Sequence, residues 1–150
     1  MPVTDYHKQI RDAVADTLDG LSLGMPVVRL DDLDQCNGYI SLPCVVVAPV
    51  GPESAEPSLG TNQHDGIRYS VAVAYLSTGV ANGSQSGPQD LTALRREVRV
   101  AFNQKRLSGV TEVGWCEVSD LGAIFERDSE AFQRLRTGLV VSACGRFPRS

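Results

Sequence analysis

The sequence lacks the features that mark several large classes of protein. No apolar run comes near the roughly 20 residues that a bilayer-spanning helix needs, and the polar, amphipathic start MPVTDYHKQIRDAV is not expected to be a signal peptide. The chain has only two histidines and four cysteines, and no Cys-x-x-Cys pair occurs. We therefore expect no zinc site, and we expect free, mostly buried thiols in a protein made in the cytoplasm.

Positive charge is also scarce, and it is unevenly placed. The formal net charge is −4; residues 1–60 hold nine acidic and three basic side chains, and residues 61–150 hold nine acidic and eleven basic ones. Such a chain is a poor candidate for binding nucleic acid through the phosphate backbone, because phosphate binding requires clustered lysine and arginine. Opposite net charges in these two segments favour self-association, although a solvated surface without functional meaning fits the same pattern.

What is present is the pattern of a single α+β domain over residues 1–150. Hydrophobic residues make up 42% of the chain and charged residues 21%, which are values typical of a globular domain. We expect a mostly antiparallel or mixed β-sheet flanked by two α-helices. The expected elements are a helix at about 4–21, strands at about 43–48 and 68–76, a helix at about 88–107, C-terminal strands within about 110–145, and an extended loop or arm at about 51–66.

Both expected helices carry one apolar stripe and one charged row. In the first helix, Thr4 and Asp5 are candidate caps and Gly20 marks the end. Its apolar stripe is Tyr6, Ile10, Val14, Leu18 and Leu21, and Asp5, Asp12, Asp16 and Asp19 lie on the opposite side. The second helix begins near Pro88; its stripe is Leu91, Leu94, Val98, Ala101 and Phe102, beside a row of Arg95, Arg99 and Arg106.

The strands differ in how they are patterned. A short strand is expected within MPVVRLDD, and SLPCVVVAPV is continuous and apolar, with Pro43 and Pro49 favouring a strand edge or end. RYSVAVAYL alternates, with large residues on one face and small ones on the other, so the small face is expected to allow close approach of a helix. Three C-terminal strands are expected within VTEVGWCEVSD, GAIFERD and FQRLRTGLVVSACGRF, with a turn at 128–130.

No motif predicts catalysis. The stretch DDLDQCNG superficially resembles the start of a calcium-binding loop. Counted from Asp32, however, the sixth position is Asn37 instead of glycine and the twelfth is Pro43 instead of glutamate. The stretch NGSQSGP lacks the lysine of a phosphate-binding loop. His64 and Asp65 have no obvious nucleophile beside them, and the aspartate row has no histidine. We therefore expect no catalytic residue, no metal and no cofactor.

The two charged rows allow two interpretations. They are either solvated faces of one subunit, or matching patches in a ring of copies assembled head to tail, in which Asp12 and Asp16 would face Arg95, Arg99 and Arg106 of a neighbour.

The order and texture of the elements carry a resemblance. An amphipathic helix is followed by LPCVVVAPVGPE, a polar arm, DGIRYSVAVAYLS, DLTALRREVRVAF and a strand-rich end closing on FQRLRTGLVVSA. Taken together they resemble the tail terminator (tail completion, neck) proteins of tailed bacteriophages. The resemblance implies a structural virion protein that forms a hexameric ring. The ring would cap the tail tube, stop its polymerisation, and dock to the head-side connector or stopper protein. In a contractile tail the resemblance also implies a contact with the sheath protein. It further implies that genomic DNA passes through the ring without sequence-specific binding.

The interface residues expected on this reading come from the polar arm and the charged rows. They are Glu53, Glu56, His64, Asp65, Arg95, Arg99, Arg106, Asp12 and Asp16, together with the loop before Pro88. The protein is expected in the virion tail or neck, made in the cytoplasm of the bacterial host, with no membrane partner. Alternatives are a head-completion, stopper, neck or baseplate protein, and, from another class, a small cytosolic ligand-binding domain or enzyme with a deep polar pocket.

Overall fold

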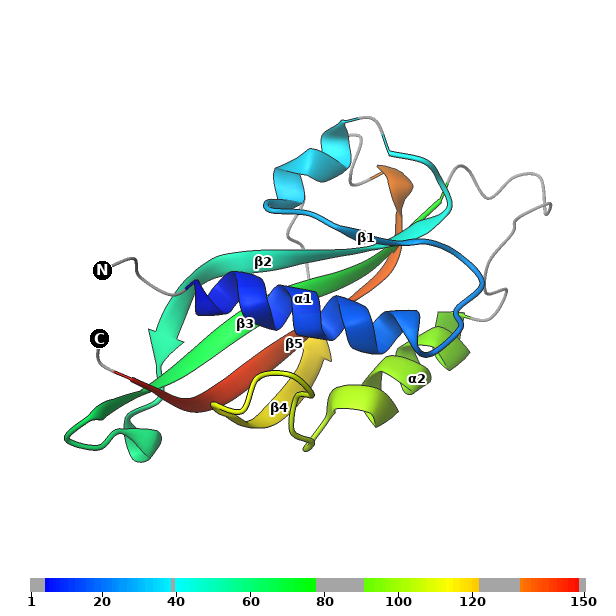
Figure 1. The fold of residues 1–150 in the computed structure, drawn as a ribbon. Helices are drawn as coiled ribbons and strands as arrows, with labels where there is room; N and C mark the ends of the chain where they lie inside the picture. Colours follow the sequence, from blue (N-terminus) through cyan, green and yellow to red (C-terminus); the bar gives the residue numbers. More distant parts are fainter. Residues whose placement is uncertain (1–4, 39, 78–90, 122–132, 149–150) are drawn as a thin grey trace.

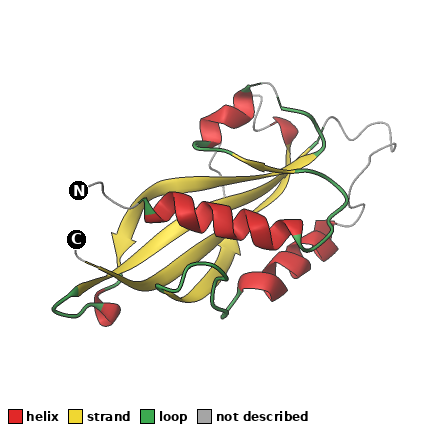
Figure 2. Cartoon of the chain, viewed as in Figure 1, coloured by secondary structure: helices red, strands yellow, loops and turns green. Residues whose placement is uncertain are grey.

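The computed structural model describes residues 5–38, 40–77, 91–121 and 133–148. It confirms an α+β fold built on a mixed five-stranded sheet in the order β1-β2-β3-β5-β4 (Figures 1 and 2). Only β1 and β2 are parallel; the other neighbours are antiparallel. The elements are α1 (Tyr6–Asp19), β1 (Val27–Arg29), the 3₁₀ helix η1 (Leu33–Asn37), β2 (Cys44–Ala55), the 3₁₀ helix η2 (Pro57–Leu59), β3 (His64–Leu76), α2 (Leu91–Phe102), β4 (Val113–Asp120) and β5 (Leu135–Pro148).

Helix α1 runs from Tyr6 to Asp19, within the expected range of about 4–21. The Asp5 side chain accepts a hydrogen bond from the backbone N–H of Lys8 at 3.0 Å, which satisfies one of the free amides of the first turn. Gly20 closes the last turn by donating to backbone carbonyls within the helix. The expected cap Thr4 lies outside the described residues. No helix in the described part of the chain is long and apolar enough to cross a membrane.

Both helices cover the same face of the sheet, as Figure 1 shows. The prediction that the small-residue face of β3 would receive a helix is therefore wrong: Val71, Val73 and Tyr75 lie under the helices. Ala72 and Ala74 face a second, smaller core, which is closed by η1 and its flanking loops. That core also takes Leu30, Cys36, Cys44, Val46, Ala48, Leu76 and Leu121.

The three consecutive valines of β2 serve both cores. Val45 and Val47 lie under the helices and Val46 faces the smaller core, and all three are at most 1% exposed. A strand covered on both faces has no polar positions to alternate with, which explains the continuous apolar run. Each valine contributes roughly 1.5–3 kcal/mol by leaving water.

The segment at 51–66, expected as an extended loop or arm, instead contains the ends of two strands joined by a turn. Strands β2 and β3 continue into it as a hairpin, which we call the long hairpin, and η2 forms its turn. The pairing shifts between Val50 and Ser54, where Gly51 adopts φ +59, a conformation that favours glycine. Most side chains of the long hairpin are exposed, so its strands carry no alternation of apolar and polar residues that would reveal them.

The C-terminal half is organised around β5. This strand pairs with β3 along its whole length, from His64 opposite Pro148 to Leu76 opposite Leu135, and with β4 on its other side. The expected strand GAIFERD and the turn at 128–130 lie outside the described residues. Helix α2 ends at Phe102, earlier than expected, because Asn103–Lys105 turn along β4: Gln104 N–H donates to Cys116 O, and Cys116 N–H donates to Lys105 O, both at 2.8 Å.

The β1 side of the sheet is only partly closed. Strand β1 pairs with Val45–Val47 alone, so among the described strands β2 has a neighbour on one side only from Ala48 to Ala55. Pro49 and Pro52 lie in this one-sided stretch, and proline has no N–H to offer another strand.

Candidate functional site

The aspartates of α1 are paired within the chain. Arg29 of β1 forms ion pairs with Asp12 at 3.6 Å, with Asp16, and with Asp19 at 3.4 Å. Hydrogen bonding to Asp16 is the main cause of a raised pKa of the Arg29 guanidinium. Arg11, 5% exposed, donates to Leu30 O at 2.6 Å and to Asp12 and Asp31 at 2.9 and 3.0 Å. These contacts fasten α1 to β1.

Two arginines of the α2 row are also paired internally. Arg95 binds Asp120 at the end of β4, and it donates to Thr137 Oγ1 at 2.9 Å and to Gly138 O at 3.2 Å. Arg99 lies 3.9 Å from the same Asp120 carboxylate. The hydrogen bond from Arg95 holds the pKa of Asp120 below its usual range. The structure thus uses these two arginines to join α2 to the sheet, whereas Arg106 is not part of this network.

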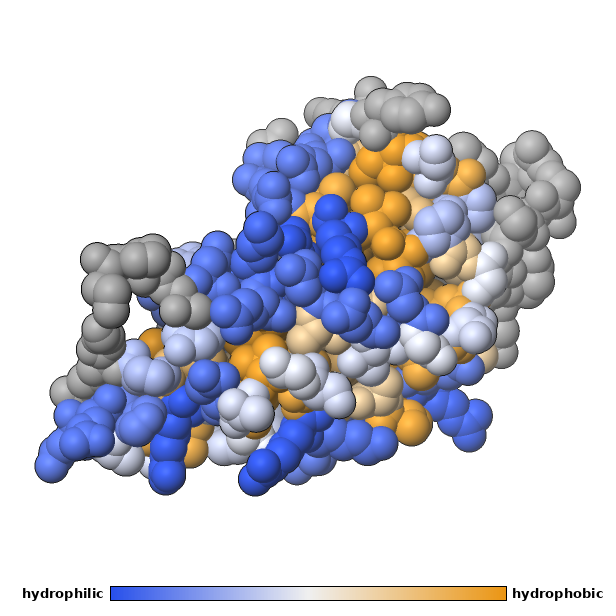
Figure 3. Space-filling model, viewed as in Figure 1, coloured by the Kyte–Doolittle hydropathy of each residue, from blue (hydrophilic) through white to orange (hydrophobic). Residues whose placement is uncertain are grey.

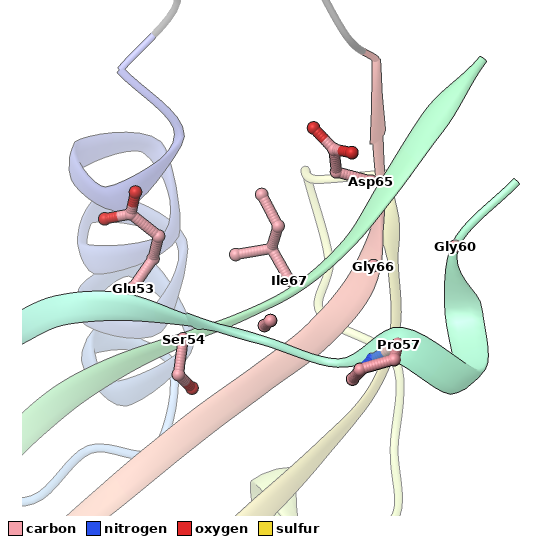
Figure 4. A pocket seen from close by; sticks show the side chains of 8 residues that line it. Glu53, Ser54, Pro57, Gly60, Asp65, Gly66 and Ile67 are labelled. Atoms are coloured by element: carbon pink, nitrogen blue, oxygen red, sulfur yellow. The ribbon is translucent and has the colours of Figure 1, made fainter. Parts of the chain in front are cut away.

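One side of the long hairpin is an open acidic hollow. Figure 4 shows the carboxylates of Glu53 and Asp65 on either side of the Ile67 side chain. The hollow is completed by Ser54, Ala55, Pro57, Gly60 and Gly66. Of the expected arm residues, Glu53 and Asp65 therefore both line this hollow, whereas Glu56 pairs with Arg68 at 3.2 Å. Arg68 also binds Glu117 of β4 at 2.8 Å, which lowers the pKa of that carboxyl.

The other side of the long hairpin forms an open groove with cationic walls, which we call the basic groove. It brings together His64 and Arg106, which sequence reasoning placed in different surfaces, with Arg146 of β5. Trp115 and Pro148 add apolar area, and Leu59, Thr61, Thr111, Glu112, Gly114 and Gly145 complete it. Trp115 and Arg146 were not predicted as part of a site. The available indications were that Trp115 is the single tryptophan of the sequence and that an arginine, Arg146, interrupts the mostly apolar end of the C-terminal strand.

An acidic turn lies at the opposite edge of the sheet, directly after β1. Asp31, Asp32 and Asp34, which we call the acidic turn, are all exposed. The Asp32 carboxylate accepts from the Asp34 N–H at 2.9 Å and caps η1. Beside this turn is a shallow hollow lined by Val28, Leu30, Gln35, Gly38, Ile40 and Ser41. Figure 3 shows hydrophobic surface in the region of β1, above the hydrophilic surface of α1.

The described residues contain no cluster of three or more His, Cys, Asp or Glu side chains that could hold a metal ion. The four cysteines are free and buried, as the sequence predicts. Burial raises the pKa of Cys36 to about 11 and that of Cys116 to about 12, and it also raises the pKa of Cys44 and Cys144. The thiolate is the reactive form, so these thiols are poor nucleophiles near neutral pH.

The thiols should accordingly resist an aromatic disulfide reagent in the folded protein. At pH 8 a thiol with a pKa near 11 is ionised in on the order of one molecule in a thousand, and burial blocks access besides. We expect no rapidly reacting thiol in the native protein and four in guanidinium chloride, measured by thionitrobenzoate absorbance. A rapidly reacting thiol in the native protein would contradict this picture of the core.

Comparison with known proteins yields a likeness of fold. No protein-family model matches the chain, and no curated protein sequence matches it. Its fold is similar to that of a component of an extracellular contractile injection system, PVC, solved by cryo-electron microscopy. That component is the sheath/tube terminator, in the extended state. The TM-score is 0.58 and the sequence identity 14%; the match covers 100% of this chain, which spans 58% of the length of the terminator.

Proposed function

We propose that this protein is a tail terminator: a structural subunit that caps the head-proximal end of a tail tube and ends its polymerisation. The observation that carries the proposal is the match of its entire length to the fold of a sheath/tube terminator. The order of its sequence elements, which resembles that of the tail terminator family, independently supports the same proposal. The role is architectural, and no residue is assigned to catalysis.

In this proposal the working unit is a homo-oligomeric ring, a hexamer, in the tail or neck of a virion. One side of the ring contacts the last layer of tube protein, the other contacts the head-side connector or stopper, and in a contractile tail the rim meets the sheath. Genomic DNA passes through the ring without being read, which the formal net charge of −4 supports. The long hairpin is the part of the subunit we assign to contacts between layers, because it projects from the sheet and most of its side chains are exposed.

Deleting the gene from the genome that encodes it tests this function. We expect tubes of irregular, excessive length and DNA-filled heads without tails, measured by negative-stain electron microscopy of the lysate, and plasmid expression of the chain should restore normal particles. Tails of normal length beside heads that have lost their DNA would instead assign the protein to the stopper position. Normal particles would contradict a place in the virion neck.

A further inference from the structure

The basic groove presents cations that the fold itself does not neutralise. Within the described residues, neither Arg106 nor Arg146 forms an ion pair, and the Arg106 side chain has no hydrogen bond. Arg146 uses only its Nε, which donates to Leu59 O at 3.0 Å. The single carboxylate of the lining, Glu112, accepts from Thr111 Oγ1 at 3.4 Å. The groove therefore offers free guanidinium donors beside the Trp115 ring, a combination suited to binding carboxylates.

The acidic turn has the opposite excess. Among the residues that the structure describes, only Asp31 of the three carboxylates is ion-paired, with Arg11, and the Asp31 side chain remains 81% exposed. The backbone of the turn is fixed, because Asp31 N–H donates to Gln35 Oε1 at 2.9 Å and Asp32 caps η1. Carboxylates carried on a fixed turn lose little conformational freedom when they bind, which favours their use as a docking element.

The two surfaces lie on different parts of the subunit. The acidic turn follows β1, at one edge of the sheet, and the basic groove lies against β4 and the ends of β3 and β5, toward the other edge. A symmetric dimer that buried either surface against itself would place like charges together. Opposite patches at opposite edges of the sheet match when copies associate head to tail, and such contacts produce rings when the rotation closes.

We propose that the basic groove binds the acidic turn of a second copy of this chain, with Arg106 and Arg146 facing Asp32 and Asp34. The apolar hollow around Val28 and Ile40, beside the turn, meets Trp115 in the same contact. This inference deepens the proposed function and rests on it, since it names the surfaces that join subunits of the ring. It replaces the contact between the α1 aspartates and the α2 arginines, because those charges are already paired within each subunit.

Cross-linking between two variants that each carry one added cysteine tests this contact. Asp34→Cys and Arg106→Cys are purified separately, mixed in equal amounts and mildly oxidised. We expect a disulfide-linked dimer in the mixture and none with either variant alone, because a head-to-tail contact brings unlike positions together. The four native cysteines are buried and serve as the unmodified background. The matched control mixes Asp34→Cys with Arg96→Cys, an exposed arginine of α2 that is not among the groove residues.

Charge exchange supplies a second readout. Arg106→Glu should weaken self-association about tenfold, measured by analytical ultracentrifugation, Arg96→Glu should leave it unchanged, and adding Asp34→Arg to Arg106→Glu should restore it. Absence of mixed dimers above the Arg96 control overturns the proposal. So does binding of a fluorescent oligonucleotide that depends on Arg106 in the absence of cross-links, which would make nucleic acid the occupant. If deletion still produces unterminated tubes while cross-linking fails, the proposed function stands and only this contact falls.

Discussion

Phe102→Ala is expected to lower the free energy of unfolding by about 3–5 kcal/mol, the loss typical of truncating a buried aromatic ring. Phe102 is 1% exposed and ends α2, where it joins the core with Leu94 and Val98. Phe102 is the largest of the buried side chains that the described part of α2 gives to this core, so its truncation leaves the largest cavity. Urea denaturation followed by circular dichroism measures the change.

Val100 supplies the matched control for this prediction. It lies on the same helix, two residues earlier, but is 61% exposed. Val100→Ala should change stability by no more than about 0.5 kcal/mol. Equal effects of the two substitutions would contradict the assignment of the inner face of α2. Because Asn103–Lys105 run directly from Phe102 along β4, Phe102→Ala should also displace Arg106 and weaken any contact made by the basic groove.

Gly145→Ala is expected to lower the free energy of unfolding by about 1–3 kcal/mol, the range typical of forcing extra atoms into a packed interior. A Cβ atom at Gly145 would lie 2.1 Å from Glu112 O and 2.9 Å from Val113 Cα. Both are backbone atoms, so the strands themselves would have to separate. The hydrogen bond from Arg146 N–H to Glu112 O, 3.1 Å long, would be strained by the same shift.

Gly114 is the control for this substitution. It lies in the facing strand β4, and a Cβ there would meet Cys144 O at 3.6 Å, an ordinary contact. Gly114→Ala should therefore be nearly neutral, whereas Gly145→Ala should lower the urea midpoint at unchanged slope. If both variants unfold at the wild-type midpoint, the close approach of β5 to the start of β4 is wrong.

Much of the fold could be predicted because its strongest signals are local. The stripe of Ile10, Val14 and Leu18 repeats at the helical period, and all three are fully buried. Strand β3 alternates between two cores, so its large and small residues separate by face. The assignment of those faces was wrong, because residue size alone does not state which side the helices will cover.

The long hairpin and the charged rows show why the rest could not be predicted. A strand whose two faces both meet water needs no alternation, so Gly51–Ala55 was indistinguishable from a loop. The internal partners of the charged rows could not be predicted because they come from elsewhere in the chain: Arg29 from β1 for Asp16, and Asp120 from β4 for Arg95. The basic groove combines α2's continuation, the long hairpin and β5, and no single window of sequence contains it.

The one-sided stretch of β2, from Ala48 to Ala55, has a consequence for how copies add to one another. The free backbone N–H and C=O groups of an edge strand can pair with a strand of another chain, and such pairing can repeat without limit. Pro49, Pro52 and the irregular pairing at Gly51 interrupt this edge of β2, so extension of the sheet from one subunit to the next is disfavoured. In the ring that we propose, subunits would therefore join through side-chain surfaces, whose geometry can close a circle after a fixed number of members.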